Sequence, residues 1–166
     1  MNRSTDARRN TPAGSPASTR ELLRQTRDQI SAVEVSLVAL RAEQSDHLTS
    51  ALTNGATVRE VVEASGVSRA YLHRAGLPLY AGSSPSTRSI DRTTEPAERT
   101  TDRTEALIKT SEIRDRVALL KAEVAETKAQ RVDQVTQLLA LDVDQPTIAG
   151  DAGVSAEWIR RISKAR

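Results

Sequence analysis

The chain contains the stretch TVREVVEASGVSRAYLHRA at residues 57–75 and the related stretch DQPTIAGDAGVSAEWIRRI at residues 144–162. In each stretch the tripeptide Gly-Val-Ser interrupts a helical pattern, which predicts a short helix, a tight turn and a second short helix. Gly66 can adopt the left-handed conformation that the turn requires, which costs most other residues roughly 1 kcal/mol or more. Ser68 is a good N-cap for the second helix. The two stretches therefore predict two helix-turn-helix units.

The pattern of the first stretch also predicts how its first helix begins and which side is buried. Thr57 and Glu60 have the spacing of a capping box, in which the threonine oxygen and the glutamate carboxylate satisfy free amides at the helix start. The residues expected on the buried side are Val61, Val62, Val67, Leu72 and Ala75. The residues left facing outward are Arg69, Ala70, His73 and Arg74.

A longer helical pattern precedes each stretch. Apolar residues three or four positions apart form one stripe between Glu21 and about Thr53, and Gly55 supplies a left-handed stop. The members of this stripe are Ile30, Val33, Leu37 and Leu40. A second long helix is expected from Glu105 to about Leu141. Its stripe consists of Val117, Leu120 and Val124. Because a lone helix would leave its stripe exposed to water, we expect the two long helices to pair as a coiled coil.

The two halves of the sequence align without a gap when one is moved by 87 positions along the other. The alignment covers the long helices as well as the two helix-turn-helix stretches. The aligned pairs include Arg27 with Arg114, Asp28 with Asp115, Leu37 with Val124, Gly66 with Gly153 and Tyr71 with Trp158. Two occurrences of Gly-Val-Ser with the upstream stripes also in phase indicate an internal repeat.

The composition divides the chain into four parts. Residues 1–20 are rich in Ser, Thr, Pro, Gly and Arg, and we expect a disordered tail because such a segment buries too little to offset its ordering entropy. Residues 21–80 hold the first long helix and helix-turn-helix, residues 81–104 are expected to form a flexible linker, and residues 105–166 hold the second pair. The tail contains the basic residues Arg3, Arg8 and Arg9. A solvated tail is the favoured interpretation of these residues, and a basic arm that enters a DNA minor groove is the alternative.

The overall composition favours a small all-α protein. With 166 residues, 37% of them hydrophobic and none of them phenylalanine, the chain has too little bulk for one large core. A net charge of +2 and a pI of about 9.3 neither favour nor exclude a nucleic-acid partner. Because no apolar run reaches membrane-spanning length and the N-terminus lacks the apolar core of a signal peptide, we expect a cytoplasmic protein that does not contact membranes.

Residues that could carry catalytic chemistry are few. Cysteine is absent, which excludes a disulfide framework, a thiolate metal site and a cysteine nucleophile. The two histidines, His47 and His73, lack nearby ligand partners, which argues against a metal site. No phosphate-binding glycine loop, nucleophile elbow or metal triad occurs, so we expect neither an enzyme nor a cofactor.

The two stretches resemble the helix-turn-helix of bacterial repressors and resolvases. Members of that class carry an apolar or small pair in the first helix, a glycine at the turn, an apolar residue directly after it and another apolar residue five positions later. The corresponding residues here are Val61, Val62, Gly66, Val67 and Leu72 in the first stretch, and Ile148, Ala149, Gly153, Val154 and Ile159 in the second. Ala149 is the small residue usually found where the two helices cross, whereas Val62 departs from the pattern.

The resemblance implies a recognition helix in the major groove, with residues near its N-terminus reaching base edges. Carried over by position, the candidate DNA-binding residues are Ser68, Arg69, Ala70, His73 and Arg74 in the first stretch, and Ser155, Ala156, Glu157, Arg160, Arg161 and Lys164 in the second. Arginine can donate two hydrogen bonds to guanine, and glutamate can accept one from cytosine. Tyr71 and Trp158 are expected to pack against a neighbouring helix rather than to stack on bases.

The expected function is sequence-specific binding of double-stranded DNA, as a bacterial transcriptional repressor or a phage- or plasmid-type DNA-organising factor associated with the nucleoid. Because the two sets of candidate residues differ, we expect two related but non-identical half-sites, about 34 Å apart. A pseudo-dimer within one chain is the expected arrangement. A homodimer is its alternative, and parallel and antiparallel helix pairing are both compatible with the sequence. The alternative function is a coiled-coil adaptor whose small helical units bind a protein partner.

Overall fold

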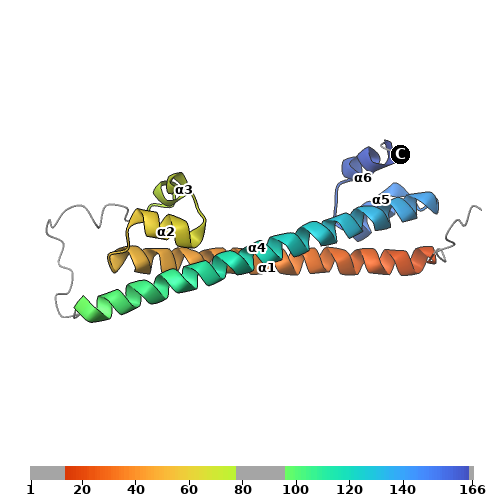
Figure 1. Cartoon of the computed structure of the whole chain (residues 1–166). Helices are drawn as coiled ribbons and strands as arrows, with labels where there is room; N and C mark the ends of the chain where they lie inside the picture. The colour runs from red at the N-terminus through yellow and green to blue at the C-terminus, as the bar shows by residue number, and fades with distance from the viewer. Residues whose placement is uncertain (1–13, 78–95, 165–166) are drawn as a thin grey trace, which may run out of the picture. The chain divides into compact units, whose positions relative to one another are not determined.

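The computed structural model describes residues 14–77 and 96–164, and these residues form six α-helices and no strand (Figure 1). The helices are α1 (Pro16–Thr53), α2 (Val58–Ser65), α3 (Arg69–Arg74), α4 (Pro96–Ala140), α5 (Gln145–Ala152) and α6 (Ala156–Lys164). The all-helical fold predicted from the sequence is therefore confirmed. No helix within the described ranges combines the length and the apolar character needed to cross a lipid bilayer.

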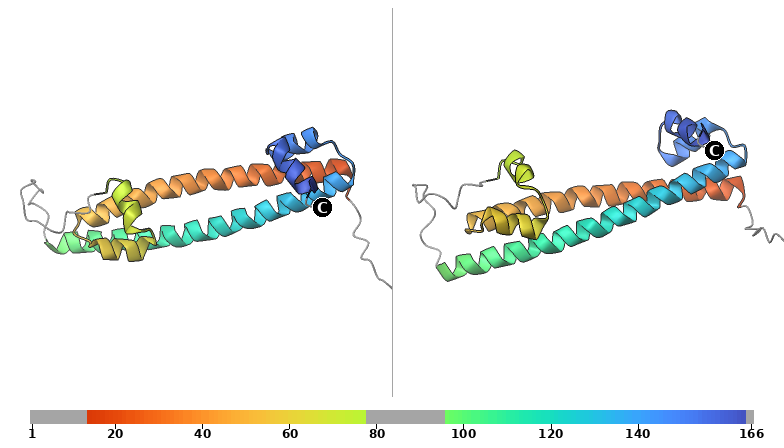
Figure 2. Two further views of the ribbon diagram at one scale, coloured as in Figure 1. Left: turned by 90° about the horizontal axis from the view of Figure 1, so that it is seen from above. Right: turned by 45° about the horizontal axis from the view of Figure 1, so that its top comes forward.

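The chain divides into two compact units, each of which contains part of α1, part of α4 and one pair of short helices. The split unit comprises Met1–Ser31 and Ala125–Arg166, so it combines the start of α1 with the end of α4, α5 and α6. The continuous unit comprises Ala32–Val124, so it combines the end of α1 with α2, α3 and the start of α4. Within each unit the α1 and α4 segments lie side by side and run in opposite directions (Figures 1 and 2).

The hydrophobic core of the split unit joins α1 to α4 and to both short helices. Leu23 of α1 is fully buried and clusters with Leu138 of α4, Ile148 of α5 and Ile159 of α6. The other buried members of this cluster are Val135, Ala149 and Ala152. Because α1 and α6 come from opposite halves of the sequence, the second helix-turn-helix is held in place by the first long helix.

The core of the continuous unit is also formed by α1, α4 and one pair of short helices, here α2 and α3. Leu48 of α1 clusters with Val61 of α2, Leu72 of α3 and Ala106 of α4. The other buried members are Ala51, Leu52 and Ala56. The helix-turn-helix of this unit consists of α2 and α3, which follow α1 in the sequence. Here too a long helix from the other half of the sequence, α4, packs against it.

The apolar stripe predicted for the first long helix lies largely on its buried side. Ile30, Leu37 and Leu40 are buried, and Val33 is half-buried. In the second long helix the stripe is less well buried. Val124 is buried there, whereas Val117 and Leu120 are half-buried.

Both long helices begin earlier than the sequence pattern indicated. The first begins at Pro16 rather than at Glu21, so residues 16–20 are helical and not part of a tail. The Ser15 hydroxyl accepts a hydrogen bond from the Ser18 amide at 3.3 Å and so acts as a cap. Proline suits the first helical turn because its missing N–H would be unsatisfied there in any case.

The second long helix begins at Pro96 rather than at Glu105, so the predicted linker boundary at residue 104 is wrong. Ala106 near this start is buried against the first helix-turn-helix, and Arg103 forms an ion pair with Glu60. These contacts stabilise the first turns of a helix whose local sequence, rich in threonine, favours helix formation only weakly. The rest of the predicted linker, residues 78–95, and the tail residues Arg3, Arg8 and Arg9 lie outside the described residues.

Candidate nucleic-acid interface

The α2–α3 head, residues 57–77, begins with the predicted capping box. The Thr57 hydroxyl accepts a hydrogen bond from the Glu60 amide at 3.3 Å, and the Thr57 amide donates one to the Glu60 carboxylate at 2.8 Å. These hydrogen bonds from the backbone and hydroxyl of Thr57, with help from Arg103, hold the pKa of Glu60 below its ordinary value. The start of α2 is therefore fixed by the side chains that the sequence indicated.

The turn of this head also has the predicted geometry. Gly66 has a φ of 66°, in the left-handed region, and its amide donates to the Val62 carbonyl at 2.9 Å. The Ser68 hydroxyl caps α3 by accepting a hydrogen bond from the Tyr71 amide at 3.2 Å. Leu72 is fully buried and anchors α3 to the core, which leaves the opposite face of α3 in contact with solvent.

All five candidate residues of this head are exposed: Ser68, Arg69, Ala70, His73 and Arg74. Two expectations for the same helix are wrong. Ala75 is exposed rather than buried, because α3 ends at Arg74 and Ala75 is only its C-cap. Tyr71, which was expected to pack against a neighbouring helix, is 42% exposed and is not part of the core cluster of its unit.

The α5–α6 head, residues 144–164, repeats this geometry. Asp144 caps α5 by accepting a hydrogen bond from the Thr147 amide at 2.9 Å, and the contacts with Thr147 lower the pKa of Asp144. Gly153 has a φ of 64°, and the Ser155 hydroxyl accepts from the Trp158 amide at 3.2 Å. Ile159 is fully buried, as Leu72 is in the other head.

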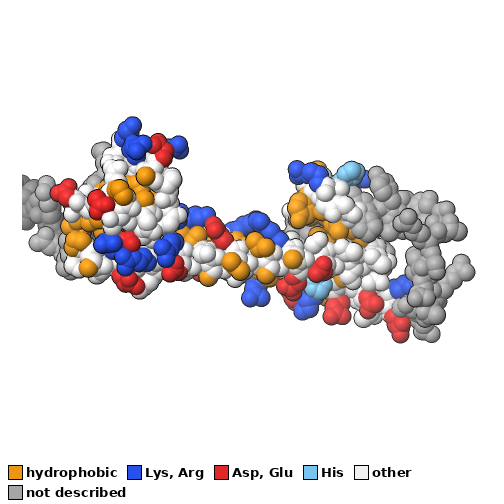
Figure 3. Space-filling view, turned by 180° about the vertical axis from the view of Figure 1, so that it is seen from behind, with side chains coloured by type: hydrophobic (Ala, Val, Ile, Leu, Met, Phe, Trp, Pro, Cys, Tyr) orange, Lys and Arg blue, Asp and Glu red, His pale blue; other side chains and the backbone are white. Residues whose placement is uncertain are grey.

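The candidate residues of the second head are also exposed: Ser155, Ala156, Glu157, Arg160, Arg161 and Lys164. Their side chains interact with one another. The Glu157 carboxylate accepts a hydrogen bond from Arg160 Nη1 at 2.5 Å and lies 3.6 Å from Arg161 Nε. Figure 3 shows basic side chains gathered over the second short helix of each head, with one acidic side chain beside them on α6 and a histidine beside them on α3.

Trp158 packs as the sequence predicted. Its ring is half-buried beside the core of the split unit, and the guanidinium of Arg131 on α4 lies 5.4 Å from the ring centroid. At this distance a cation–π interaction links α6 to the long helix. Trp158 therefore helps to orient α6, and its ring is not free to stack on bases.

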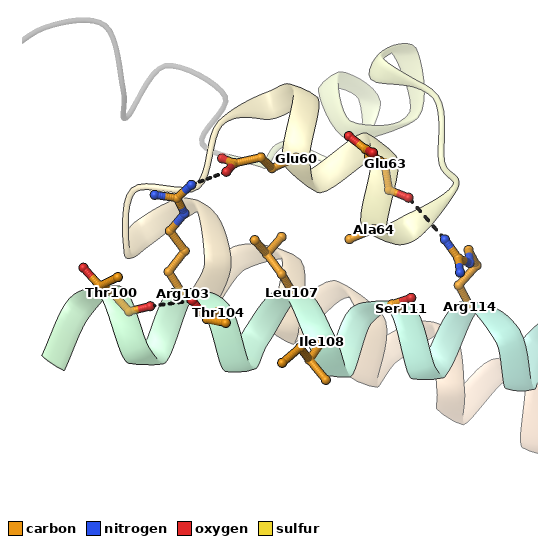
Figure 4. Close-up of a pocket in the computed structure, with 10 residues that line it drawn as sticks. All are labelled: Glu60, Glu63, Ala64, Thr100, Arg103, Thr104, Leu107, Ile108, Ser111 and Arg114. Atoms are coloured by element: carbon orange, nitrogen blue, oxygen red, sulfur yellow. Dashed lines mark hydrogen bonds and ion pairs between the residues drawn. The ribbon is translucent and has the colours of Figure 1, made fainter. Parts of the chain in front are cut away.

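An arginine from the opposite half of the chain covers the turn glycine of each head. Arg114 of α4 lies against Gly66, and its Nη1 donates to the Glu63 carbonyl at 3.2 Å (Figure 4). Arg27 of α1 lies against Gly153, and its Nη1 approaches the Gly150 carbonyl at 3.5 Å. We call these two contacts the arginine seats. Each seat satisfies a carbonyl near the end of the first short helix and so fixes the head on a long helix.

The arginine seats were not predicted from the sequence, although a signal for them was present. The dipeptide Arg-Asp occurs at residues 27–28 and again 87 positions later, at residues 114–115. In both places the arginine Nε donates to the following aspartate at 2.8 Å, which holds the guanidinium in position. A charged pair repeated in phase with the turn glycines indicates a shared contact, but the pattern alone does not identify the partner.

A buried aspartate provides a second link between head and long helix in the split unit. Asp151 of α5 is 8% exposed and accepts hydrogen bonds from Arg20 at 2.6 Å and Arg24 at 2.8 Å, both on α1. Burial acts to raise the pKa of Asp151, but the two arginines outweigh it and hold that pKa below its ordinary value. The continuous unit has a different link, the ion pair of Glu60 with Arg103 in Figure 4.

Replacing Asp151 with asparagine is expected to lower the free energy of unfolding of the split unit by roughly 1–2 kcal/mol at pH 7, since both arginine partners are partly exposed. Because the folded-state pKa is depressed, the contribution of the carboxylate is complete above the unfolded pKa and is lost as the pH falls through the folded pKa. Urea titrations followed by the fluorescence of Trp158, the single tryptophan, should therefore show the variant and the wild type converging in acid.

The exposed Asp133→Asn serves as the control for this charge change in the same unit. It should leave the stability at pH 7 within about 0.5 kcal/mol of the wild type. A constant difference between Asp151→Asn and the wild type from pH 7 to pH 3 would contradict the assigned ion pairs.

A shallow groove of about 590 Å³ lies between α2 and α4 in the continuous unit (Figure 4). Its lining residues include Ala64, Leu107, Ile108 and the two paired arginines Arg103 and Arg114. None of the candidate DNA-binding residues lines it. Among the residues that the structure describes, no group of three or more potential metal ligands occurs. Comparisons with protein families, curated proteins and solved structures found no match for this chain.

Proposed function

We propose that this protein binds double-stranded DNA in a sequence-specific manner through α3 and α6, as a transcriptional repressor or a phage- or plasmid-type DNA-organising factor of the nucleoid. The observation that carries this proposal is the structure of α3 and α6, the second short helix of each head. A left-handed glycine precedes it, one fully buried aliphatic residue anchors it, and polar and basic side chains occupy its exposed face. This is the arrangement by which a recognition helix enters a major groove.

The way each head is attached also supports recognition. The arginine seats and the Asp151 ion pairs hold the heads on long helices, so an approaching duplex would meet α3 and α6 in fixed orientations within their units. Side chains that are already ordered lose less conformational entropy on binding. The starts of α3 and α6, which Ser68 and Ser155 cap, also present backbone amides, and a DNA phosphate is favoured at such a helix start.

The proposal includes a duplicated ancestral segment and a coiled-coil pairing of the long helices within one chain, which makes a pseudo-dimer. The duplication is supported by pairs of residues, 87 positions apart, that have the same structural role in the two halves. Gly55 and Asp142 both have positive φ after a long helix, and Arg27 and Arg114 both seat a turn glycine. Burial of Leu23 against α4 of the same chain supports pairing within the chain over pairing between two chains.

A coiled-coil adaptor that binds protein is the second candidate. It is favoured by large apolar side chains that face solvent on the long helices of the continuous unit: Val35 at 68%, Val38 at 66% and Leu119 at 72% exposure. Scattered exposed aliphatic residues are common on folded proteins, whereas two similarly built heads with basic exposed faces are not, so DNA binding is the better-supported function.

A gel shift titrated with salt separates the two candidates. A DNA-binding protein loses affinity steeply as the salt concentration rises, since each neutralised phosphate releases counterions, whereas an adaptor shows no shift. Replacing Arg160 and Arg161 with alanine is expected to weaken DNA binding by at least about tenfold and to reduce the salt dependence.

The matched control replaces two exposed arginines of the long helices, Arg41 and Arg116, with alanine. It removes the same charge and should change the affinity much less. Selection from random DNA should return two related but non-identical half-sites. A perfect palindrome, or equal affinity of the two double variants, would contradict the proposed interface.

A further inference from the structure

The two proposed recognition helices differ in the charges of their exposed first turn, where α3 has Arg69 and α6 has Ala156 at the first position. At the second position the α6 helix has Glu157, and the α3 helix has Ala70. Glu157 is bonded to Arg160 at 2.5 Å and lies 3.6 Å from Arg161, so three charged side chains form one cluster on α6. In the described part of the chain, neither Arg69 nor Arg74 of α3 has an ion-pair partner.

A carboxylate at this position has two opposite effects on DNA binding. It is repelled by every phosphate, so it lowers the affinity for DNA in which its charge finds no partner. It also accepts a hydrogen bond from the exocyclic amine of cytosine, the base that glutamate and aspartate commonly contact in the major groove. Its net effect is therefore favourable only where a base amine, such as that of cytosine, faces it.

The contact between Glu157 and Arg160 adds a further restriction. Residues three apart on a helix are neighbours, and the observed ion pair holds the guanidinium beside the carboxylate. An arginine held in this way has fewer rotamers available for phosphates, while it can still donate to a guanine next to the cytosine. Glu157 and Arg160 therefore present a hydrogen-bond acceptor and a bidentate hydrogen-bond donor side by side on α6.

We propose that Glu157 is the specificity-determining residue of the α5–α6 head, and that it selects cytosine at one position of the half-site while it lowers affinity for other DNA. This inference rests on the proposed DNA-binding function and extends it to a division of labour between the heads. The α2–α3 head, which has arginines but no such carboxylate, contributes affinity with weaker discrimination among bases.

The test compares base preference and affinity in the full chain for the wild type, Glu157→Gln and Glu157→Ala. Selection from random DNA identifies the preferred site, and binding is then measured on that site, on variants with a single base pair changed, and on unrelated DNA. Glu157→Ala should remove the cytosine preference at one position, which is about tenfold in affinity, and Glu157→Gln should shift that preference toward adenine, because a glutamine amide pairs with N6 and N7 of adenine. Both should also raise the affinity for unrelated DNA by a few fold, because the repulsion is gone and two arginines are released.

Two matched variants complete the experiment. Ala70→Glu places a carboxylate at the corresponding position of α3 and should lower affinity for unrelated DNA while it adds a base preference to the other half-site. The exposed Glu126→Gln on α4 makes the same charge change as Glu157→Gln and should alter neither property.

The outcomes distinguish this inference from the function on which it rests. Failure of the wild type to bind DNA in a salt-dependent manner would remove the proposed function itself. Binding that persists with an unchanged base preference in Glu157→Ala would overturn only the role of Glu157. A uniform loss of affinity for all sequences would also overturn it, since that result marks Glu157 as a residue that merely supports α6.

Discussion

Replacing Leu23 with alanine is expected to lower the free energy of unfolding of the split unit by about 2–5 kcal/mol. Leu23 is fully buried in the cluster that joins α1 to α4, α5 and α6, so the substitution leaves a cavity at the junction of four helices. The expected result is a large shift of the urea midpoint, measured by the fluorescence of Trp158, which lies beside the same core.

The neighbouring leucine provides a control with the same chemical change. Leu22 is 52% exposed, and Leu22→Ala keeps the helix propensity of the site high, so it should cost less than about 1 kcal/mol. Equal effects of the two substitutions would mean that the start of α1 does not pack against the second helix-turn-helix.

Replacing Gly153 with alanine is expected to destabilise the same unit by about 2–4 kcal/mol. The left-handed backbone, with a φ of 64°, accounts for part of this cost. The added methyl group accounts for the rest, because it would lie 2.7 Å from Cδ and 2.9 Å from Cγ of Arg27. Arg27 would have to leave its seat and give up its contact with the Gly150 carbonyl.

Two further substitutions resolve these contributions. Gly150→Ala lies inside α5 with nothing within 4 Å of the added methyl group, so it should stabilise the unit by roughly 0.5–1 kcal/mol. In a chain that already carries Arg27→Ala, Gly153→Ala should cost only the backbone strain. A cost for Gly153→Ala that is independent of Arg27, measured by the same fluorescence titration, would rule out the seat.

Local chemistry made the heads predictable from the sequence. The spacing of Thr57 and Glu60 predicts a capping box. Gly66 predicts the turn, because glycine is favoured where the chain adopts a left-handed conformation. Each of these signals depends on residues within four positions of one another. For the same reason most of the exposed residues of α3 and α6 could be assigned from the sequence, with Tyr71 as an exception.

Contacts between distant parts of the chain were not predictable in this way. Asp151 reads as an ordinary surface charge in the sequence, but Arg20 and Arg24, more than a hundred positions away, make its burial possible. The early helix start at Pro96 likewise depends on packing of Ala106 against the first head, which no local pattern encodes. Direction of helix pairing was open for the same reason.

The aromatic residues show the limit of arguing from equivalent positions. Tyr71 and Trp158 align in the two halves and were expected to pack alike. Only Trp158 does so, because α4 supplies Arg131 opposite its ring, whereas the aligned position on α1 is Gln44, which instead lies within 3.5 Å of the Ser65 carbonyl. A change in the long helix has thus altered the surroundings of the short one.

The split unit has a consequence for the order of events during synthesis. Residues 16–31 leave the ribosome early, but the cluster that buries Leu23 also requires α4, α5 and α6. The core of the continuous unit contains no residue beyond Leu107, so all of its members are synthesised before α5 and α6. The buried face of the start of α1 therefore remains exposed to water until α6 has been synthesised. During this interval the nascent chain is most accessible to chaperones and proteases.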